Sequence, residues 1–276
     1  MADATAEIPK PRKPPKPKAL KGPVRRRVKR YGKRLTRRLS AYQSHQSLVP
    51  NTPFLGNEHF PFLKKFEDRW EEMQAEVHEV LKFREHIPGF QEISPDQYRI
   101  ATANNWKTFI LFGFGDKLER NCKQAPVTAE ILGRAPNIQT AWFSILAPGY
   151  HIPAHTGVTK GILRAHLGLV IPRKRGKCRI RVDDETRAWE AGKVFVLDDT
   201  YNHEVWNDTD EERVILLFDF DRPMRFGGRF MNWLLLKLIK LTAFYQEPKK
   251  DIQDFEARFE AAAKRANENL EKLGDL

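Results

Sequence analysis

The sequence predicts a mostly β core, an antiparallel sandwich or barrel with helices before and after it. Two observations lead to this fold class. The middle of the chain holds many short apolar runs of strand length, bounded by Gly, Pro and Asn, with no helical spacing between them. Apolar residues at helical spacing occur before and after that region. Short strands without intervening helices are typical of antiparallel sandwiches and barrels.

The first segment, residues 1–45, is predicted to be a basic disordered arm. It alternates Pro with Lys and Arg, a composition that cannot bury enough apolar surface to offset the entropy of ordering. Residues 1–40 hold 15 Lys and Arg against Asp3 and Glu7, a balance of 15 − 2 = +13, while the whole chain carries +12. The folded part is therefore nearly neutral, which argues against nucleic acid as a partner. Helical character is expected near Arg25 to Leu39.

A β domain over residues 46–225 is predicted next, opened by an amphipathic helix. From Phe62 the apolar residues recur at steps of three and four with Lys and Glu between them. They are Leu63, Phe66, Trp70, Met73, Val77, Val80 and Leu81.

The strands of this domain are predicted from apolar runs separated by Pro172, Gly176, Gly192 and Asn207. These runs are Phe109 to Phe114, Ala141 to Leu146, Leu163 to Ile171, Cys178 to Val182, Lys193 to Leu197, His203 to Trp206 and Val214 to Phe220.

The last segment, residues 226–276, is predicted to be a helical extension. Phe230 to Tyr245 is strongly apolar and interrupted by Lys237 and Lys240, so it can lie in a membrane interface or pack on its own domain. Phe255 to Leu273, rich in Ala, Glu and Lys, is expected to be a solvated helix.

Two cysteines, Cys122 and Cys178, exclude a disulfide framework and a four-thiolate zinc site but leave a single bridge open. The N-terminus lacks the apolar stretch of a signal peptide, and no window has the roughly 20 apolar residues needed to span a bilayer. The expectation is a cytoplasmic protein whose only membrane contact is peripheral, on the cytoplasmic face.

Four of the eight histidines lie between residues 151 and 203, in the strand-rich region: His151, His155, His166 and His203. Imidazole is a good ligand for iron, copper and zinc, and residues on neighbouring strands can converge. The cluster therefore indicates a metal site. The alternative, that each histidine only satisfies an ordinary hydrogen bond, stays open on this evidence.

Two segments carry a family resemblance: HTGVTKGILRAHLGLVIP, from His155 to Pro172, and WEAGKVFVLDDTYNHEVWN, from Trp189 to Asn207. Together they resemble the aspartyl/asparaginyl β-hydroxylase family, which includes bacterial lipid A hydroxylases, and the resemblance spans roughly residues 60 to 225. It implies a double-stranded β-helix, or jelly roll, and an enzyme that depends on iron(II), 2-oxoglutarate and O2.

The resemblance assigns His155 and His203 as the iron ligands. Most related oxygenases add a carboxylate two residues after the first histidine. Here that position is Gly157, as in this family. Asp198 and Asp199, just before His203, could supply a ligand or support the imidazole, but a turn before the strand is the favoured interpretation.

The resemblance also implies a 2-oxoglutarate site. Arg213 would bind the distal carboxylate through its planar guanidinium, with Ser144, Arg164 and His166 as further contacts. Arg164 and His166 alternate along one strand and should therefore project to the same face. No acid or base residue beyond the metal centre is needed.

The implied reaction is the hydroxylation of an unactivated C–H bond, and the favoured substrate is a fatty acyl chain of lipid A or a related lipid. The basic arm and the apolar C-terminal stretch support an anionic membrane surface as partner. Hydroxylation of Asp or Asn in proteins or peptides is the alternative, and a non-catalytic jelly-roll binding module is a second one.

Overall fold

The computed structural model describes residues 38–93, 100–101, 104–113, 115–157, 159–240 and 252–265. Structural statements below concern these residues. Most of the predicted basic arm lies outside them, but residues 38–46 form a helix that continues past the expected helical part of the arm.

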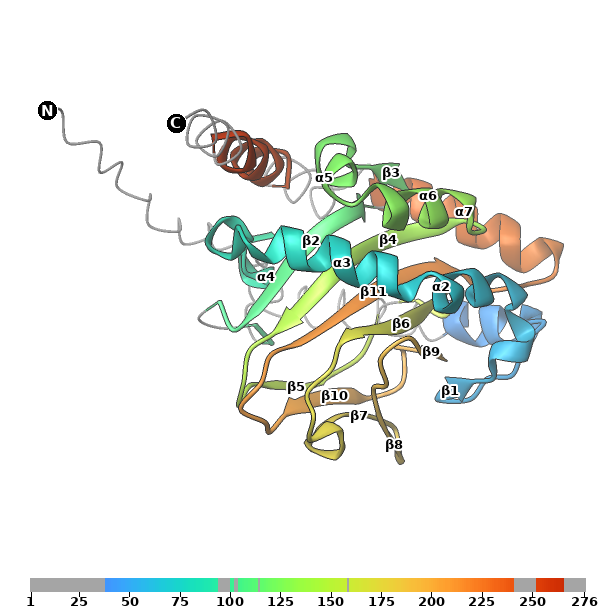
Figure 1. The fold of residues 1–276 in the computed structure, drawn as a ribbon. Coiled ribbons are helices and arrows are strands. Elements are labelled where there is room, and N and C mark those ends of the chain that lie inside the picture. Colours follow the sequence, from blue (N-terminus) through green and yellow to red (C-terminus); the bar gives the residue numbers. More distant parts are fainter. Residues whose placement is uncertain are drawn as a thin grey trace, which may run out of the picture.

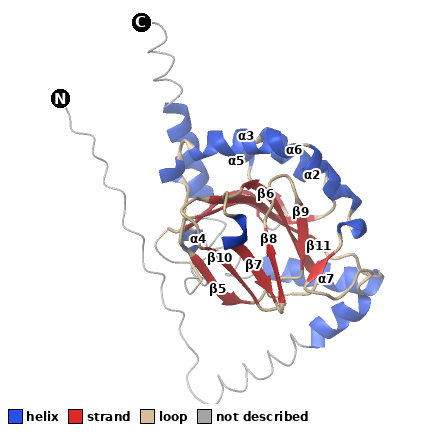
Figure 2. Ribbon diagram, turned by 60° about the horizontal axis from the view of Figure 1, so that its bottom comes forward, coloured by secondary structure: helices blue, strands red, loops and turns tan. Residues whose placement is uncertain are grey.

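The core consists of two antiparallel sheets, one of seven strands and one of four (Figures 1 and 2). The larger sheet has the order β1 (Phe54–Leu55), β9 (Val194–Leu197), β6 (Ile162–Val170), β11 (Arg213–Asp221), β4 (Ile138–Leu146), β2 (Trp106–Gly113) and β3 (Asp116–Lys117). The smaller sheet has the order β5 (His151–His155), β10 (His203–Asn207), β7 (Cys178–Val182) and β8 (Glu185–Ala188). From β4 onward the chain passes repeatedly from one sheet to the other, as in a jelly roll, so the predicted fold class is confirmed.

Helices cover the outer face of the larger sheet (Figure 1). These are α2 (Lys64–Asp68), α3 (Trp70–Leu81), α5 (Glu119–Gln124) and α6 (Pro126–Arg134). The helix predicted from Phe62 to Leu81 is present but divided at Arg69, whose backbone leaves the helical region. The prediction of strands without intervening helices was wrong for α5 and α6, which lie between β3 and β4.

The remaining short helical segments lie in connections. They are η1 (Asn57–His59), η2 (Pro61–Leu63), η3 (Arg84–His86), α4 (Phe90–Ile93) and η5 (Arg175–Lys177).

The central strand β11 contributes apolar side chains to both core layers. Val214, Leu216, Phe218 and Phe220 belong to the core beneath the helices, whereas Ile215 and Leu217 belong to the core between the sheets. Successive side chains of a strand point to opposite faces, so β11 is buried on both sides. Polar residues at its two ends, Arg213 and Asp219, share the inner face with Ile215 and Leu217 because all four have the same parity.

The C-terminal part begins with α7 (Phe226–Lys240), and a second helix occupies residues 252–265. The rest of the predicted apolar helix, to Tyr245, lies outside the described residues. The second helix was predicted to be solvated, but Phe259 is buried against Phe83 and Phe109. The carboxylate of Glu256 also accepts hydrogen bonds from two backbone N–H groups at the start of α5. This helix is therefore packed on the domain by one face.

Cys122 and Cys178 are both buried and free, so the bridge that the sequence left open is not formed. Within the described ranges, no helix has the length and apolar character needed to cross a bilayer.

Candidate metal centre

His155 and His203 lie opposite each other on neighbouring strands of the smaller sheet. His155 is the last residue of β5 and His203 is the first of β10, and the two are direct partners in the antiparallel register. Their ring centroids are 4.1 Å apart. The structure thus brings together two residues that are far apart in the sequence, and β5 and β10 can be followed side by side in Figure 1.

Each imidazole is oriented by a carbonyl of its own chain segment. Nδ1 of His155 donates to the carbonyl oxygen of Pro153 at 2.8 Å, and Nδ1 of His203 donates to that of Tyr201 at 2.9 Å. A carbonyl oxygen only accepts, so Nδ1 carries the hydrogen in both rings. In the neutral ring Nε2 then has a free lone pair. A backbone carbonyl fixing the opposite nitrogen in this way is typical of metal-ligating histidines.

Burial keeps both rings neutral. Burial and, to a smaller extent, the nearby His155 lower the pKa of His203 to about 3, against the opposing effect of the Tyr201 carbonyl. Burial also lowers the pKa of His155, which the Pro153 carbonyl partly offsets. A metal needs the neutral imidazole, so at neutral pH protons do not compete for these two nitrogens.

A third protein ligand does not join the pair: the described part of the chain contains no cluster of three or more His, Cys, Asp or Glu suited to a metal. Gly157 stands two residues after His155, and a side chain there would overlap the carboxylate of Asp199. The Gly157 N–H donates to the Asp199 backbone carbonyl at 2.6 Å. The donor set is therefore two imidazoles, with one carboxylate packed against the backbone beside them.

Asp198 and Asp199 have different roles despite being adjacent. Asp198 is fully buried, bonds the backbone N–H and hydroxyl of Thr200, and pairs with Arg222 and Lys160. It forms the turn before β10, which confirms the favoured interpretation for that residue. Asp199 instead faces Arg164 at 3.4 Å, and burial raises its pKa to about 6.

Arg164 and His166 project from β6 to the inner face, as their alternation predicts, but Arg164 is already paired. Its guanidinium makes two hydrogen bonds to Asp219, at 2.7 and 2.9 Å. Asp219 is its partner in the neighbouring strand. The structure therefore places Arg164 near the histidines with its charge balanced by Asp219 and Asp199, which leaves it poorly suited to bind a further carboxylate.

Arg213 has no such partner in the part of the chain that the structure describes. It begins β11, is only 2% exposed, and lies over the indole of Trp189 with its guanidinium carbon 4.8 Å from the ring centroid. Its Nε has no hydrogen-bond partner, and no ion pair among the described residues involves it. Burial lowers its pKa to about 10, so it stays charged at neutral pH. The equally buried Arg222, by contrast, is paired with Asp198.

His166 and Ser144 provide further donors on the same inner face. The indole Nε1 of Trp189 donates to Nδ1 of His166 at 3.3 Å, so the hydrogen of this neutral ring lies on Nε2, which has no partner. Burial lowers the pKa of His166 well below its usual value, and the charges of Arg164 and Arg213 lower it further. Ser144 is buried and accepts a hydrogen bond from Trp106, which leaves its hydroxyl hydrogen free to donate.

Several residues of the site were not anticipated from the sequence. Trp189 contacts both Arg213 and His166, and its position at the start of the second motif could have drawn attention to it. One further buried polar atom without a partner, the indole nitrogen of Trp142, lies on the same strand as Ser144, two residues before it. Buried polar groups are rarely left unpaired, so this inner face has the character of a ligand site.

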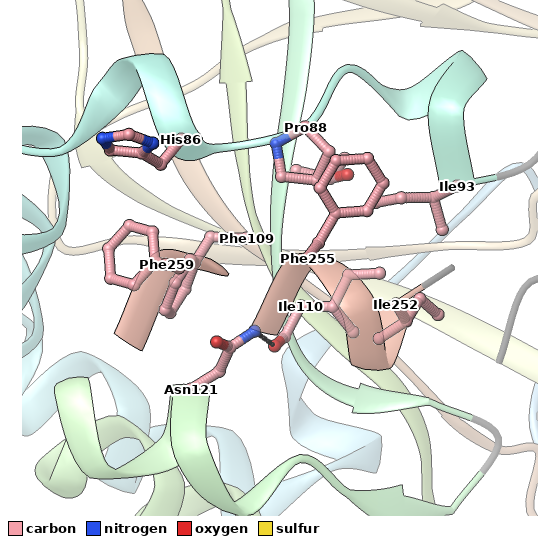
Figure 3. Close-up of a pocket in the computed structure, with 10 residues that line it drawn as sticks. His86, Pro88, Ile93, Phe109, Ile110, Asn121, Ile252, Phe255 and Phe259 are labelled. Carbon is pink, nitrogen blue, oxygen red and sulfur yellow. Dashed lines mark hydrogen bonds between the residues drawn. The ribbon is translucent and has the colours of Figure 1, made fainter. Parts of the chain in front are cut away.

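A separate pocket lies between β2 and the helix at residues 252–265 (Figure 3). It is lined largely by apolar side chains such as Phe109, Phe255 and Phe259, and none of the six predicted site residues contributes to it. Figure 3 shows Asn121 directed at the Ile110 carbonyl, to which it donates at 2.8 Å. This pocket belongs to the packing of the C-terminal helix.

Comparison with known proteins places these residues in a family context. The family model described as aspartyl/asparaginyl beta-hydroxylase matches residues 67–223. The chain is 41% identical over 213 residues to an ornithine lipid ester-linked acyl 2-hydroxylase of Rhizobium tropici, a match that covers 77% of this chain and 76% of that protein. It is 40% identical over 134 residues to a human aspartyl/asparaginyl beta-hydroxylase.

The human match covers 47% of this chain and 17% of that protein, so the chain spans a small part of that relative. Among solved structures, the cupin domain of Cnp3 from Schizosaccharomyces pombe is 14% identical, with a TM-score of 0.30, and the match covers 42% of this chain and 65% of that one. A likeness that slight has no bearing on function.

Proposed function

The chain belongs to the aspartyl/asparaginyl β-hydroxylase family of enzymes, and we propose that it is an iron(II)- and 2-oxoglutarate-dependent hydroxylase that inserts one oxygen atom from O2 into an unactivated C–H bond. One observation carries the cofactor part of this proposal: two neutral imidazoles with free Nε2 atoms occur in the same sandwich as a buried arginine that has no carboxylate partner among the described residues, and both His203 and Arg213 lie close enough to His166 to lower its pKa. The first feature suits a divalent metal, and the second suits an anionic cosubstrate.

His155 and His203 would hold the iron, each through Nε2. When bound, the iron supplies the activation of O2 that accompanies oxidative decarboxylation of 2-oxoglutarate to succinate. The protein contributes orientation. The Pro153 and Tyr201 carbonyls fix the two rings, and the antiparallel register fixes their separation. No third ligand from the described residues crowds the pair, which leaves positions for cosubstrate and O2.

Arg213 would bind the distal carboxylate of 2-oxoglutarate. An unpaired charge in a buried position is costly, and a ligand carboxylate would relieve that cost through charge-assisted hydrogen bonds. The hydroxyl of Ser144 and Nε2–H of His166 are donors on the same face. Trp189 holds Arg213 and His166 in place and, with the apolar residues Ile215 and Leu217, limits access of water.

We propose a lipid acyl chain, of lipid A or a related lipid, as the substrate. The support is the rhizobial ornithine lipid acyl 2-hydroxylase, which resembles this chain over most of both proteins. The alternative is an Asp or Asn side chain of a protein or peptide, supported by the human relative over a shorter stretch. A non-catalytic binding module fits less well because the ligand pair and the unpaired arginine are both present.

Succinate formation from 2-oxoglutarate tests this proposal. Iron-loaded protein is mixed with air in the presence of an ornithine lipid, a lipid A precursor or an acidic peptide, and parallel reactions omit iron. Iron-dependent succinate stimulated by a lipid, together with a lipid product heavier by one oxygen atom, would support the proposal. Stimulation by the peptide alone would favour the alternative, and absence of iron-dependent succinate with every candidate would argue for a binding module.

A further inference from the structure

Large apolar side chains are exposed in one region of the molecule. Those that stand out to solvent among the described residues are Tyr42, Leu48, Phe226, Phe230, Trp233, Leu234 and Leu238. All of them lie either in residues 38–48 or in α7. Phe226 is 83% exposed and Phe230 is 56% exposed. Clustered exposure of this kind marks an interaction surface, whereas single exposed apolar residues do not.

The two segments form one continuous surface. The backbone N–H of Arg225 donates to the carbonyl of Gln46, and that of Leu48 donates to Pro223. The side chain of Gln43 lies within hydrogen-bond distance of Asn232 on the buried side of α7. We call the seven exposed apolar residues of 38–48 and α7 the apolar face. In Figure 2, α7 lies apart from the helices that cover the larger sheet, so this face belongs to a different side of the molecule.

The two segments that form the apolar face carry only basic charges of their own, although Asp116 of β3 lies 3.6 Å from Lys240 at the end of α7. No Asp or Glu occurs in residues 38–57 or 222–240. Arg225, just before α7, and Arg229 and Lys237 on α7 are exposed, and the ammonium of Lys237 lies 4.4 Å from the ring centroid of Trp233. A helix with an apolar stripe that holds Trp and Phe, and whose own charged residues are all basic, matches the interface of an anionic bilayer. A water-facing protein surface would normally carry both signs of charge.

The apolar face lies at the end of the sandwich where the two histidines are. β5 ends at His155, β10 begins at His203, and β11 ends at Asp221, shortly before α7. The loop after His155 is hydrogen-bonded to the buried sides of α7 and of residues 38–48. Asn232 donates to the Gly161 carbonyl at 3.0 Å, and Thr159 donates to Gln43 at 3.2 Å. A surface that docks on α7 would therefore come close to the candidate metal centre.

We infer that α7 and residues 38–48 form a docking surface for an anionic lipid bilayer, which positions the histidine end of the sandwich against the membrane. The apolar stripe inserts among the acyl chains, and Arg225, Arg229 and Lys237 contact the headgroups. The inference deepens the proposed function, because a docked enzyme receives a lipid substrate directly from the bilayer. The biological role of docking rests on the proposed function, but docking itself requires neither iron nor turnover.

Flotation of the full chain, without metal, on vesicles of phosphatidylcholine with phosphatidylglycerol tests the inference. The double variant Phe230→Ser/Trp233→Ser removes two exposed side chains and should reduce vesicle partitioning at least about tenfold. Measurement at high salt screens the attraction of the basic arm and leaves the apolar contribution visible. Lys237→Glu should weaken binding roughly tenfold at low salt. Its matched control, Lys82→Glu just after the end of α3, should change binding less than about twofold.

Three outcomes would overturn the inference. Unchanged partitioning of the double variant would show that the arm alone binds lipid. Equal effects of Lys237→Glu and Lys82→Glu would indicate non-specific charge attraction. A dimer in sedimentation that the double variant dissociates, without vesicle binding by the wild type, would assign the face to a second copy of the chain. Vesicle binding without iron-dependent succinate would leave the docking surface in place and reject the hydroxylase.

Discussion

The carboxylate of Asp199 fills the space that a side chain at residue 157 would occupy, so Gly157 and Asp199 are spatially coupled although 42 positions separate them in the sequence. The backbone reinforces the coupling, because the Gly157 N–H donates to the Asp199 carbonyl. This contact joins the segment after His155 to the segment before His203. The contact therefore lies just beyond the ends of β5 and β10, and it helps to fix His155 opposite His203.

Gly157→Ala should lower the free energy of unfolding by about 1–3 kcal/mol, because the added methyl displaces a buried carboxylate. Asp199→Ala in the same chain should restore part of the loss, so a double-mutant cycle by urea unfolding measures the coupling. Gly176→Ala is the control, since a Cβ there meets no neighbouring atom. Additive effects of the two substitutions would contradict this account.

Arg213 and Arg222 should respond in opposite ways to the same substitution. Arg213→Met removes a buried charge without a partner and should raise the unfolding free energy by about 1 kcal/mol in the absence of 2-oxoglutarate. Arg222→Met leaves Asp198 buried with one cation fewer and should lower it by about 3 kcal/mol. Addition of 2-oxoglutarate to the iron-loaded protein should raise the melting temperature of the wild type further, but not that of Arg213→Met. Equal destabilisation by both substitutions would contradict the assignment of Arg213.

Trp189→Phe should weaken 2-oxoglutarate binding roughly tenfold while iron binding is retained. The indole nitrogen bonds Nδ1 of His166 and so keeps the hydrogen of that ring on Nε2. Phenylalanine cannot donate this bond, and the ring can then adopt either tautomer. Calorimetric titration with the two ligands separately checks this. Trp206→Phe is the matched control, because Trp206 stacks on His151 away from the inner face.

Asp221 should make the protein less stable as the pH rises. Burial raises its pKa to about 6, above the usual 3.8, so between those values the folded state binds the proton that the unfolded state has lost. The contribution of Asp221 to the unfolding free energy therefore falls as the pH rises from about 4 to 6. Asp221→Asn keeps an oxygen to accept from Gln139 and Asn232.

We expect Asp221→Asn to be more stable than the wild type at pH 8 by on the order of 1–2 kcal/mol, with the difference vanishing near pH 4. Urea unfolding at both pH values measures it. A variant less stable than the wild type at pH 8 would show that the carboxylate is favourably paired.

The sequence predicted most of the sandwich but not all of it, for identifiable reasons. β11 and β6 were found because they are long, mostly apolar and buried. β5 was missed because His-Ile-Pro-Ala-His has one buried apolar residue and a proline, which only an edge strand tolerates, and β5 is at the edge of the smaller sheet. Helices α5 and α6 are short, and each depends on packing against the larger sheet and α3.

The residues of the candidate site were predicted from the sequence, whereas which of their charges are paired was known only from the structure. Arg164, His166 and Arg213 all reach the inner face, as expected from the alternation along β6 and from the resemblance. Arg164 is paired with a carboxylate and Arg213 is not, because of the strand register. The register places Asp219 opposite Arg164 and Leu146 opposite Arg213. Register is determined by pairing across the whole sheet, so the unpaired state of Arg213 could not be inferred from its neighbours in the chain.

Anaerobic titration of the protein with iron(II) and 2-oxoglutarate tests the central claim most directly, because the chelate of iron(II) with a 2-oxo acid absorbs visible light. The account predicts that the wild type develops this absorption and saturates at one equivalent of iron. His151→Ala, the same substitution on β5 outside the pair, should behave as the wild type does, whereas His155→Ala and His203→Ala should not develop the band. Undiminished absorption in either of those two variants, or none in the wild type, would contradict the claim that His155 and His203 hold iron.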